Sequence, residues 1–279
     1  MNNGTADMTQ KKKINWLHEI WQLALLGLAV LGFHSAIAKP FYIPSESMLP
    51  SLMVGDRLVV TKYPYGYSYL SPSLISLPEM KGRLFGRLPE RGDIVVIKSP
   101  IEHTDYIKRL IGLPGDTVQV RGGALYLNGK AVPRVALPPV DIVESPNTIC
   151  KDSRFEAVAA DGTPVCRYPR YRETLPNGVS YDTLDTEMNS YTDNTQLYRI
   201  PAGHVFLMGD NRDNSADSRV LPEPPFNGLG VLPIENLSGR AEFITFSLDG
   251  SLNLLDPRTW FGAFRGERVF ESLRPSNDG

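Results

Sequence analysis

The chain contains 279 residues with a net charge of −2, 24 glycines, 23 prolines and two cysteines. This length allows one large domain or two modest ones, and the nearly balanced charge argues against a nucleic-acid partner. The glycine and proline content argues against a mainly helical protein and favours strands joined by turns.

An apolar stretch near the N-terminus predicts a membrane-spanning helix. Residues 20–38 are almost wholly apolar, and as a helix they would extend about 28 Å, close to the hydrocarbon thickness of a bilayer. Trp16 and Trp21 stand at the entry of this stretch, where aromatic rings favour the membrane interface. We therefore predict one anchor at residues 16–38.

Charge on either side of the anchor predicts its orientation. Lysines at 11–13 outweigh the single Lys39, so residues 1–15 are expected in the cytoplasm and the rest of the chain beyond the membrane. Two alternatives remain for the apolar stretch. Residues 36–38 have the A-x-A form of a leader cleavage site, although the stretch exceeds the usual apolar length of a leader. The other alternative is a buried core helix, but nothing else in the chain would then explain why the helix is apolar on every side.

Short β-type runs bounded by turn residues follow the anchor. These runs lie at residues 56–62, 93–98, 106–111, on both sides of Asn128-Gly129, and at 204–209 and 242–247. Asn-Gly is a signal for a type I′ hairpin turn. We predict a mainly β protein: an antiparallel, barrel-like catalytic domain at 39–121 and 204–279, with an inserted β-rich subdomain at 122–203.

The inserted segment contains both cysteines, Cys150 and Cys166, and from about residue 133 to 199 it reads as polar and irregular. The spacing of the cysteines fits neither a CxxC redox pair nor a zinc knuckle. Beyond a membrane they would form a disulfide worth roughly 3 kcal/mol, and in the cytosol they would remain free thiols. A segment that follows a membrane anchor favours the disulfide.

Two segments combine aromatic side chains with turn residues. Residues 63–91 either form a hairpin packed on its own core or dip into the lipid interface, where tyrosine rings are favoured. The tail at 258–273 contains aromatic and basic side chains, among them Trp260, Arg265 and Arg268. It is either an interfacial segment or a ragged terminus.

The nucleophile candidates lie between prolines. Ser45 and Ser47 occur in the stretch 44–52, through which no helix can run because proline lacks an N–H and fixes φ. A serine on such a stiff segment has a positioned hydroxyl and spare backbone donors for an oxyanion.

The base candidate is a lysine. Beyond the anchor only His103 and His204 are available, and neither lies in a metal-ligand or triad motif. A neutral lysine can activate a serine when burial lowers its pKa. Lys108 lies in an apolar strand-like run and is the best candidate, against the alternative of an exposed lysine that extends to solvent.

Four ordered motifs behind an anchor resemble the signature boxes of the bacterial type I signal peptidases, which are serine proteases of the S26 type. They are residues 44–52 with Gly55-Asp56, residues 91–96, residues 105–116 and residues 209–219. The chain departs from many family members in having one anchor instead of two, and serine at position 51 where threonine is frequent.

The resemblance implies roles by position. Ser47 would be the nucleophile and Lys108 the general base, Ser45 would add its hydroxyl to the oxyanion hole, and Ser215 would orient the lysine amine. It also implies a supporting ion pair between Asp217 and Arg219. Pockets for small side chains would be lined by Ile43, Met48, Leu52 and Ile107. Some members carry a disulfide in the inserted subdomain, which supports a Cys150–Cys166 bridge.

The expected function is removal of A-x-A signal peptides from exported precursors at the outer (periplasmic) face of the bacterial plasma membrane. The expected partners are precursor proteins and the phospholipid membrane, with no nucleic acid, metal or organic cofactor. Two rivals are a self-cleaving Ser-Lys repressor peptidase, which the anchor argues against, and a membrane-tethered β-domain that binds peptides without cutting them.

Overall fold

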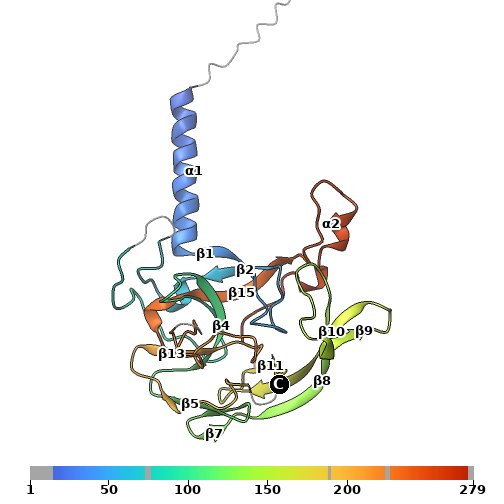
Figure 1. Ribbon diagram of the computed structural model, residues 1–279. Coiled ribbons are helices and arrows are strands. Elements are labelled where there is room, and N and C mark those ends of the chain that lie inside the picture. Colours follow the sequence, from blue (N-terminus) through green and yellow to red (C-terminus); the bar gives the residue numbers. More distant parts are fainter. Residues whose placement is uncertain (1–14, 73–76, 188–189, 224–226, 276–279) are drawn as a thin grey trace, which may run out of the picture.

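The computed structural model describes residues 15–72, 77–187, 190–223 and 227–275. Helix α1, Trp16–Ala36, projects from a body made of strands (Figure 1). In the described chain it is the one helix long and apolar enough to cross a membrane, and its side chains pack against little else. The helix ends two residues earlier than the predicted anchor, because Ala38 is already the first residue of strand β1. The predicted cytoplasmic lysines lie outside the described residues.

The main sheet is antiparallel and has seven strands in the order β1-β2-β15-β3-β4-β13-β14. Their bounds are β1 Ala38–Tyr42, β2 Asp56–Thr61, β15 Leu237–Ser247, β3 Ile94–Lys98, β4 Asp105–Gly112, β13 His204–Met208 and β14 Leu232–Pro233. The prediction of a mainly β, antiparallel fold is confirmed, and the strand predicted at 242–247 begins five residues earlier, at Leu237.

The sheet leaves two strand edges open close to each other. Among the described residues, strand β1 ends the sheet and pairs only with β2. Strand β4 pairs with β13 from Arg109 onward, so within the described chain its first residues pair with β3 alone. Both edges border one groove. An extended peptide in this groove would find unpaired backbone groups on either side.

The inserted segment is more regular than its sequence indicates. Its sheet has the order β11-β10-β8, with β9 beside β10. The strands are β8 Arg134–Val143, β9 Glu156–Val158, β10 Pro164–Thr174 and β11 Ser180–Leu184. The strands agree with the predicted β-rich inserted subdomain. The irregular reading of residues 133–199 was wrong because β8 is largely exposed and lacks the alternation of apolar and polar residues that marks a half-buried strand.

A small third sheet crosses the predicted domain boundary. It has the order β12-β5-β6-β7, with β12 Tyr198–Arg199, β5 Thr117–Arg121, β6 Ala124–Leu127 and β7 Lys130–Ala131. The predicted turn at Asn128-Gly129 joins β6 to β7, and both residues have positive φ. The boundary between residues 121 and 122 falls in the β5–β6 turn and therefore divides a hairpin.

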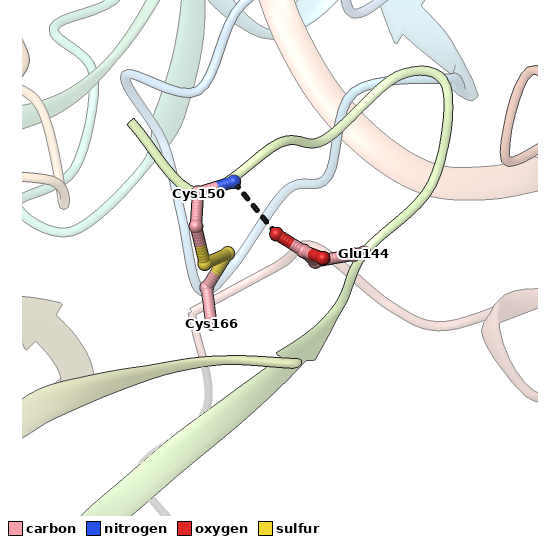
Figure 2. A group of neighbouring side chains, drawn as sticks. All are labelled: Glu144, Cys150 and Cys166. Carbon is pink, nitrogen blue, oxygen red and sulfur yellow. Dashed lines mark hydrogen bonds between the residues drawn. A yellow bond between two sulfur atoms is a disulfide. The ribbon is translucent and has the colours of Figure 1, made fainter. Parts of the chain in front are cut away.

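The disulfide joins the inserted sheet to a neighbouring loop. Cys150 and Cys166 are bonded, with their Cα atoms 5.6 Å apart. Figure 2 shows the bridge beside Glu144, whose carboxylate accepts a hydrogen bond from the Cys150 N–H at 3.2 Å. Cys166 is fully buried and packs with Leu49, so this cluster also touches the segment that carries the serines.

The two aromatic segments divide between core and surface. Tyr65 is buried, whereas Leu84 and Phe85 are 71 and 84 % exposed. In the tail, helix α2 (Thr259–Gly262) extends on the same side of the body as α1 (Figure 1), and Phe261 is exposed. The apolar tips of both segments are accessible to a membrane.

The basic residues of the tail have a different role from the one expected at an interface. Arg268 forms a two-point ion pair with the fully buried Asp56, at 3.0 and 2.7 Å. Arg265 donates to the Val54 carbonyl. These arginines hold the tail against the body and do not face outward.

Candidate active site

Ser47 lies in a turn that is held at both ends. The turn follows β1 and returns to β2 through backbone hydrogen bonds from Ile43 to Asp56 and from Gly55 to Ile43. Gly55 has φ +100°, and a Cβ atom there would lie 1.8 Å from the Leu248 carbonyl oxygen. The glycine of the Gly-Asp motif is therefore required by close backbone packing.

Lys108 reaches this turn from strand β4. Its Nζ lies 2.7 Å from the Ser47 Oγ and 2.9 Å from the Ile107 carbonyl oxygen, to which it donates. The lysine is 2 % exposed, so the alternative of an exposed lysine does not hold. The structure brings the two predicted residues together although 61 positions separate them.

Burial favours the neutral form of this lysine. It lowers the pKa of Lys108 from 10.5 to about 8; Asp217 and Asp210 oppose this effect, and Arg219 adds to it. At pH 7 a pKa of about 8 leaves about 9 % of the amine neutral, roughly 300 times the fraction at the ordinary value.

Two groups that could donate hydrogen bonds to an oxyanion lie beside the Ser47 Oγ. The Ser45 Oγ is 3.4 Å from the Ser47 Oγ. No described residue accepts a hydrogen bond from the Ser47 N–H, whereas the Ser47 carbonyl is occupied by the Asn211 N–H at 3.1 Å. The free N–H and the Ser45 hydroxyl are the groups that a developing negative charge would need.

Ser215 does not make the hydrogen bond that the resemblance implies. Its Oγ is buried, and within the described chain it has no hydrogen-bond partner. It nevertheless packs at the site: a Cβ atom on Gly209 would lie 2.3 Å from the Ser215 Oγ and 2.5 Å from the Ser47 carbonyl oxygen. Glycine at 209 thus lets the Ser215 loop approach the nucleophile.

Asp217 and Arg219 form a buried, two-point ion pair at 2.9 and 2.8 Å. The other role of Asp217 is to accept the Gly209 N–H at 2.9 Å. Burial alone would raise the pKa of Asp217, but the Arg219 guanidinium and the backbone donors hold it below its ordinary value. The pair therefore fixes the backbone that carries Ser215.

Two further ion pairs behind the dyad were not predicted. Arg109 binds both carboxylate oxygens of Asp210, at 2.8 and 2.6 Å. Arg212 binds both oxygens of Glu173, each at 2.6 Å. Arg109, Asp210 and Arg212 belong to the motifs, but Glu173 lies in the inserted sheet without any sequence signal, and it could be found only from the folded chain.

A groove of about 380 Å³ runs between the open edges of β1 and β4 and reaches Lys108. Two of the expected pocket residues, Ile43 and Ile107, line it. The other two, Met48 and Leu52, do not: both are 0 % exposed and lie in the core cluster beneath. They face inward because the turn through 47–52 folds onto the sheet, so they support the groove without touching its contents.

Possible metal ligands in the described chain do not form part of the dyad. One group contains Glu144 and the two cysteines, but both sulfurs belong to the disulfide. The other is made of Asp185, Asp193 and Asp213, of which Asp185 is paired with Arg134. The dyad atoms contact a hydroxyl and a backbone carbonyl instead.

Comparison with known proteins places this site in a family. The model described as "Signal peptidase, peptidase S26" matches residues 14–246. Signal peptidase I of Rickettsia bellii (strain OSU 85-389) is 35 % identical over 276 residues, covering 92 % of this chain and 86 % of the relative. Signal peptidase I of Rickettsia akari (strain Hartford) is 34 % identical over 289 residues, covering 98 and 97 %. The chain therefore belongs to the signal peptidase I family of S26 peptidases.

Proposed function

We propose that this protein is a membrane-anchored serine endopeptidase that removes signal peptides by acyl transfer at a Ser47–Lys108 dyad. The observation that carries the proposal is the 2.7 Å separation between the Ser47 Oγ and the amine of a buried lysine. Burying a lysine in an apolar strand costs free energy because its charged form loses hydration. A lysine kept in such a place therefore indicates a function.

Acylation follows from this geometry. The neutral Lys108 amine takes the Ser47 proton as Oγ attacks the scissile carbonyl carbon. The Ser47 N–H and the Ser45 hydroxyl stabilise the oxyanion. The resulting ammonium gives its proton to the leaving amine as the C–N bond breaks. In deacylation Lys108 takes a proton from water, which attacks the acyl-enzyme, and Ser47 regains its proton.

Ser215 is proposed to position the base. A neutral amine has two N–H groups and one lone pair, and the lone pair must face the Ser47 hydroxyl. One N–H is used by the Ile107 carbonyl. The buried Ser215 hydroxyl, which has no partner in the described chain, is available to accept the other. Asp217 and Arg219 hold this loop in place.

The groove supports recognition of an extended leader with small residues at −1 and −3. Alternate side chains of an extended peptide point the same way, so these two positions would enter the groove together. Its Ile43 and Ile107 side chains offer apolar walls. The open edges of β1 and β4 provide backbone groups for strand addition, which is a known mode of peptide recognition.

The short connection between α1 and Ser47 supports a dyad close to the membrane surface. Ser47 follows the end of α1 by only eleven residues, and Lys62 donates its backbone N–H to Ile37 at 3.1 Å, which ties the body to the helix end. The lysines before the helix favour a cytoplasmic N-terminus. We therefore propose a single-pass protein of the bacterial plasma membrane whose catalytic domain lies on the outer face.

The test compares purified full-length wild type with Ser47→Ala and Lys108→Ala, in detergent, on a precursor with an A-x-A leader between pH 6 and 10. We expect cleavage only by wild type, with kcat/KM rising through a pH near 8 as Lys108 becomes neutral. Cleavage by either variant at the wild-type rate would refute the dyad. Binding of the precursor by folded wild type without cleavage would favour the peptide-binding alternative.

A further inference from the structure

A second cavity, separate from the groove, is bordered by Ser47 itself. Its volume is about 360 Å³, and it is bordered by residues 44–47, by residues 146–151 of the inserted segment, and by Asn214. The groove at Lys108 and this cavity share Pro44 and Ser45. Ser47 therefore stands at the junction of two sites that differ in the residues around them.

Acyl transfer assigns the two sites to the two halves of a substrate. The apolar groove fits the small side chains of the acyl half, whose carbonyl carbon becomes bonded to the Ser47 Oγ. The chain beyond that carbonyl must leave the groove past Ser47, and the cavity beside residues 146–151 is a second space that Ser47 borders. This assignment rests on the proposed function.

The loop at 146–151 is held as a rigid wall of this cavity. Cys150 is bonded to Cys166 in β10, and Glu144 accepts the Cys150 N–H (Figure 2). Asn147 donates its side chain to the Leu248 carbonyl at 3.1 Å and its backbone N–H to Asp249 at 3.1 Å. A wall fixed at both ends can discriminate between side chains without first being ordered.

The accessible charge in the cavity is positive. The Lys151 side chain is 70 % exposed and pairs with Glu46, which is only 13 % exposed and also accepts from Asn214 at 3.0 Å. A ligand therefore meets the lysine ammonium before it meets the carboxylate. Beside it, Ile149 is 64 % exposed and offers an apolar contact.

We propose that the disulfide-held loop forms the subsite for the first residues of the mature protein, and that Lys151 selects acidic over basic side chains at +1 and +2. An acidic side chain gains an ion pair with Lys151 at the rim, whereas a basic one is repelled by it. Because the pair is exposed, the preference is modest, roughly two- to fivefold in kcat/KM.

The experiment uses full-length enzyme in detergent and precursor peptides that differ only at +2, with aspartate, asparagine or lysine. A second set differs only at −3, with alanine or valine. The variants are Lys151→Gln and Lys151→Glu, with Lys130→Glu as a matched control in an exposed strand outside both sites. Each preference is a ratio within one variant, so the folded fraction cancels.

We expect wild type and Lys130→Glu to prefer aspartate over lysine at +2, Lys151→Gln to lose this preference and Lys151→Glu to reverse it. The −3 ratio should be the same in all four proteins. If Lys151→Glu still prefers aspartate over lysine at +2, the subsite assignment is refuted and the proposed function remains intact. The same conclusion follows if the −3 ratio changes together with the +2 ratio. Wild type that cleaves none of the peptides would remove both proposals.

Discussion

Replacing Ser215 by alanine should separate the stability of the fold from the activity of the site. The Ser215 Oγ is buried and has no hydrogen-bond partner in the described chain. A buried unsatisfied hydroxyl costs about 1–3 kcal/mol, so its removal should leave the free energy of unfolding unchanged or raise it by about 1 kcal/mol. Most single substitutions have the opposite effect and destabilise the fold.

Activity should fall in the same variant. If Ser215 binds the Lys108 amine as it takes the proton and becomes an ammonium in the transition state, the lost hydrogen bond to a charged group is worth about 1.5–3 kcal/mol. This free energy corresponds to a decrease of roughly 10- to 150-fold in kcat/KM. Because Ser215 does not bond to Lys108 in the free structure, the pH at which kcat/KM rises should remain near 8.

Ser218→Ala is the matched control three residues away. Ser218 is also fully buried, but its Oγ accepts the Leu207 N–H at 2.9 Å. Its loss leaves a buried donor unpaired and should destabilise the fold by about 1–3 kcal/mol, with kcat/KM of the folded enzyme unchanged. The two variants are compared by denaturant unfolding and by pH-dependent kinetics. Wild-type kinetics in Ser215→Ala, or destabilisation equal to that of Ser218→Ala, would refute the assignment.

Two predictions concern buried ion pairs, and both are measured by denaturant unfolding. Arg268→Met leaves the Asp56 carboxylate buried without its partner and should cost about 3–5 kcal/mol, whereas Arg258→Met at an exposed site should change stability by less than about 0.5 kcal/mol. Burial alone would raise the pKa of Glu173, but Arg212 holds it below the ordinary value. The contribution of this pair to the free energy of unfolding is therefore complete above about pH 4.3 and is lost as the pH falls through the lowered pKa. Glu173→Gln should cost about 3–5 kcal/mol at pH 7 and reduce this acid dependence. A wild-type unfolding curve for either variant would contradict the corresponding pair.

The inserted segment shows where a local pattern is insufficient. Strand β8 is ten residues long, yet its sequence shows no strand-like alternation, because most of its residues are exposed and one is buried. The alternation of apolar and polar residues marks a strand with one buried face, so a strand that is exposed on both faces does not show it. In the tail, Arg265 and Arg268 resemble an interfacial basic pair but donate inward to Val54 and Asp56.

The sequence alone determined the features that depend on a few neighbouring residues. Apolar length predicts the α1 anchor, Asn128-Gly129 predicts a hairpin, and the prolines around Ser47 predict a stiff non-helical turn. The ordered motifs were enough to nominate Ser47 and Lys108, because each motif carries its own chemistry in a contiguous stretch.

Only the tertiary structure decided how those residues can act. The pKa of Lys108 is lowered because strands distant in sequence exclude water from it, and no local pattern measures that desolvation. The same holds for the partner of Arg212, which is Glu173 on the inserted sheet, and for Met48, which turns into the core and away from the groove. Burial and ion pairing are properties of contacts between distant segments, and those contacts exist only when the chain has folded.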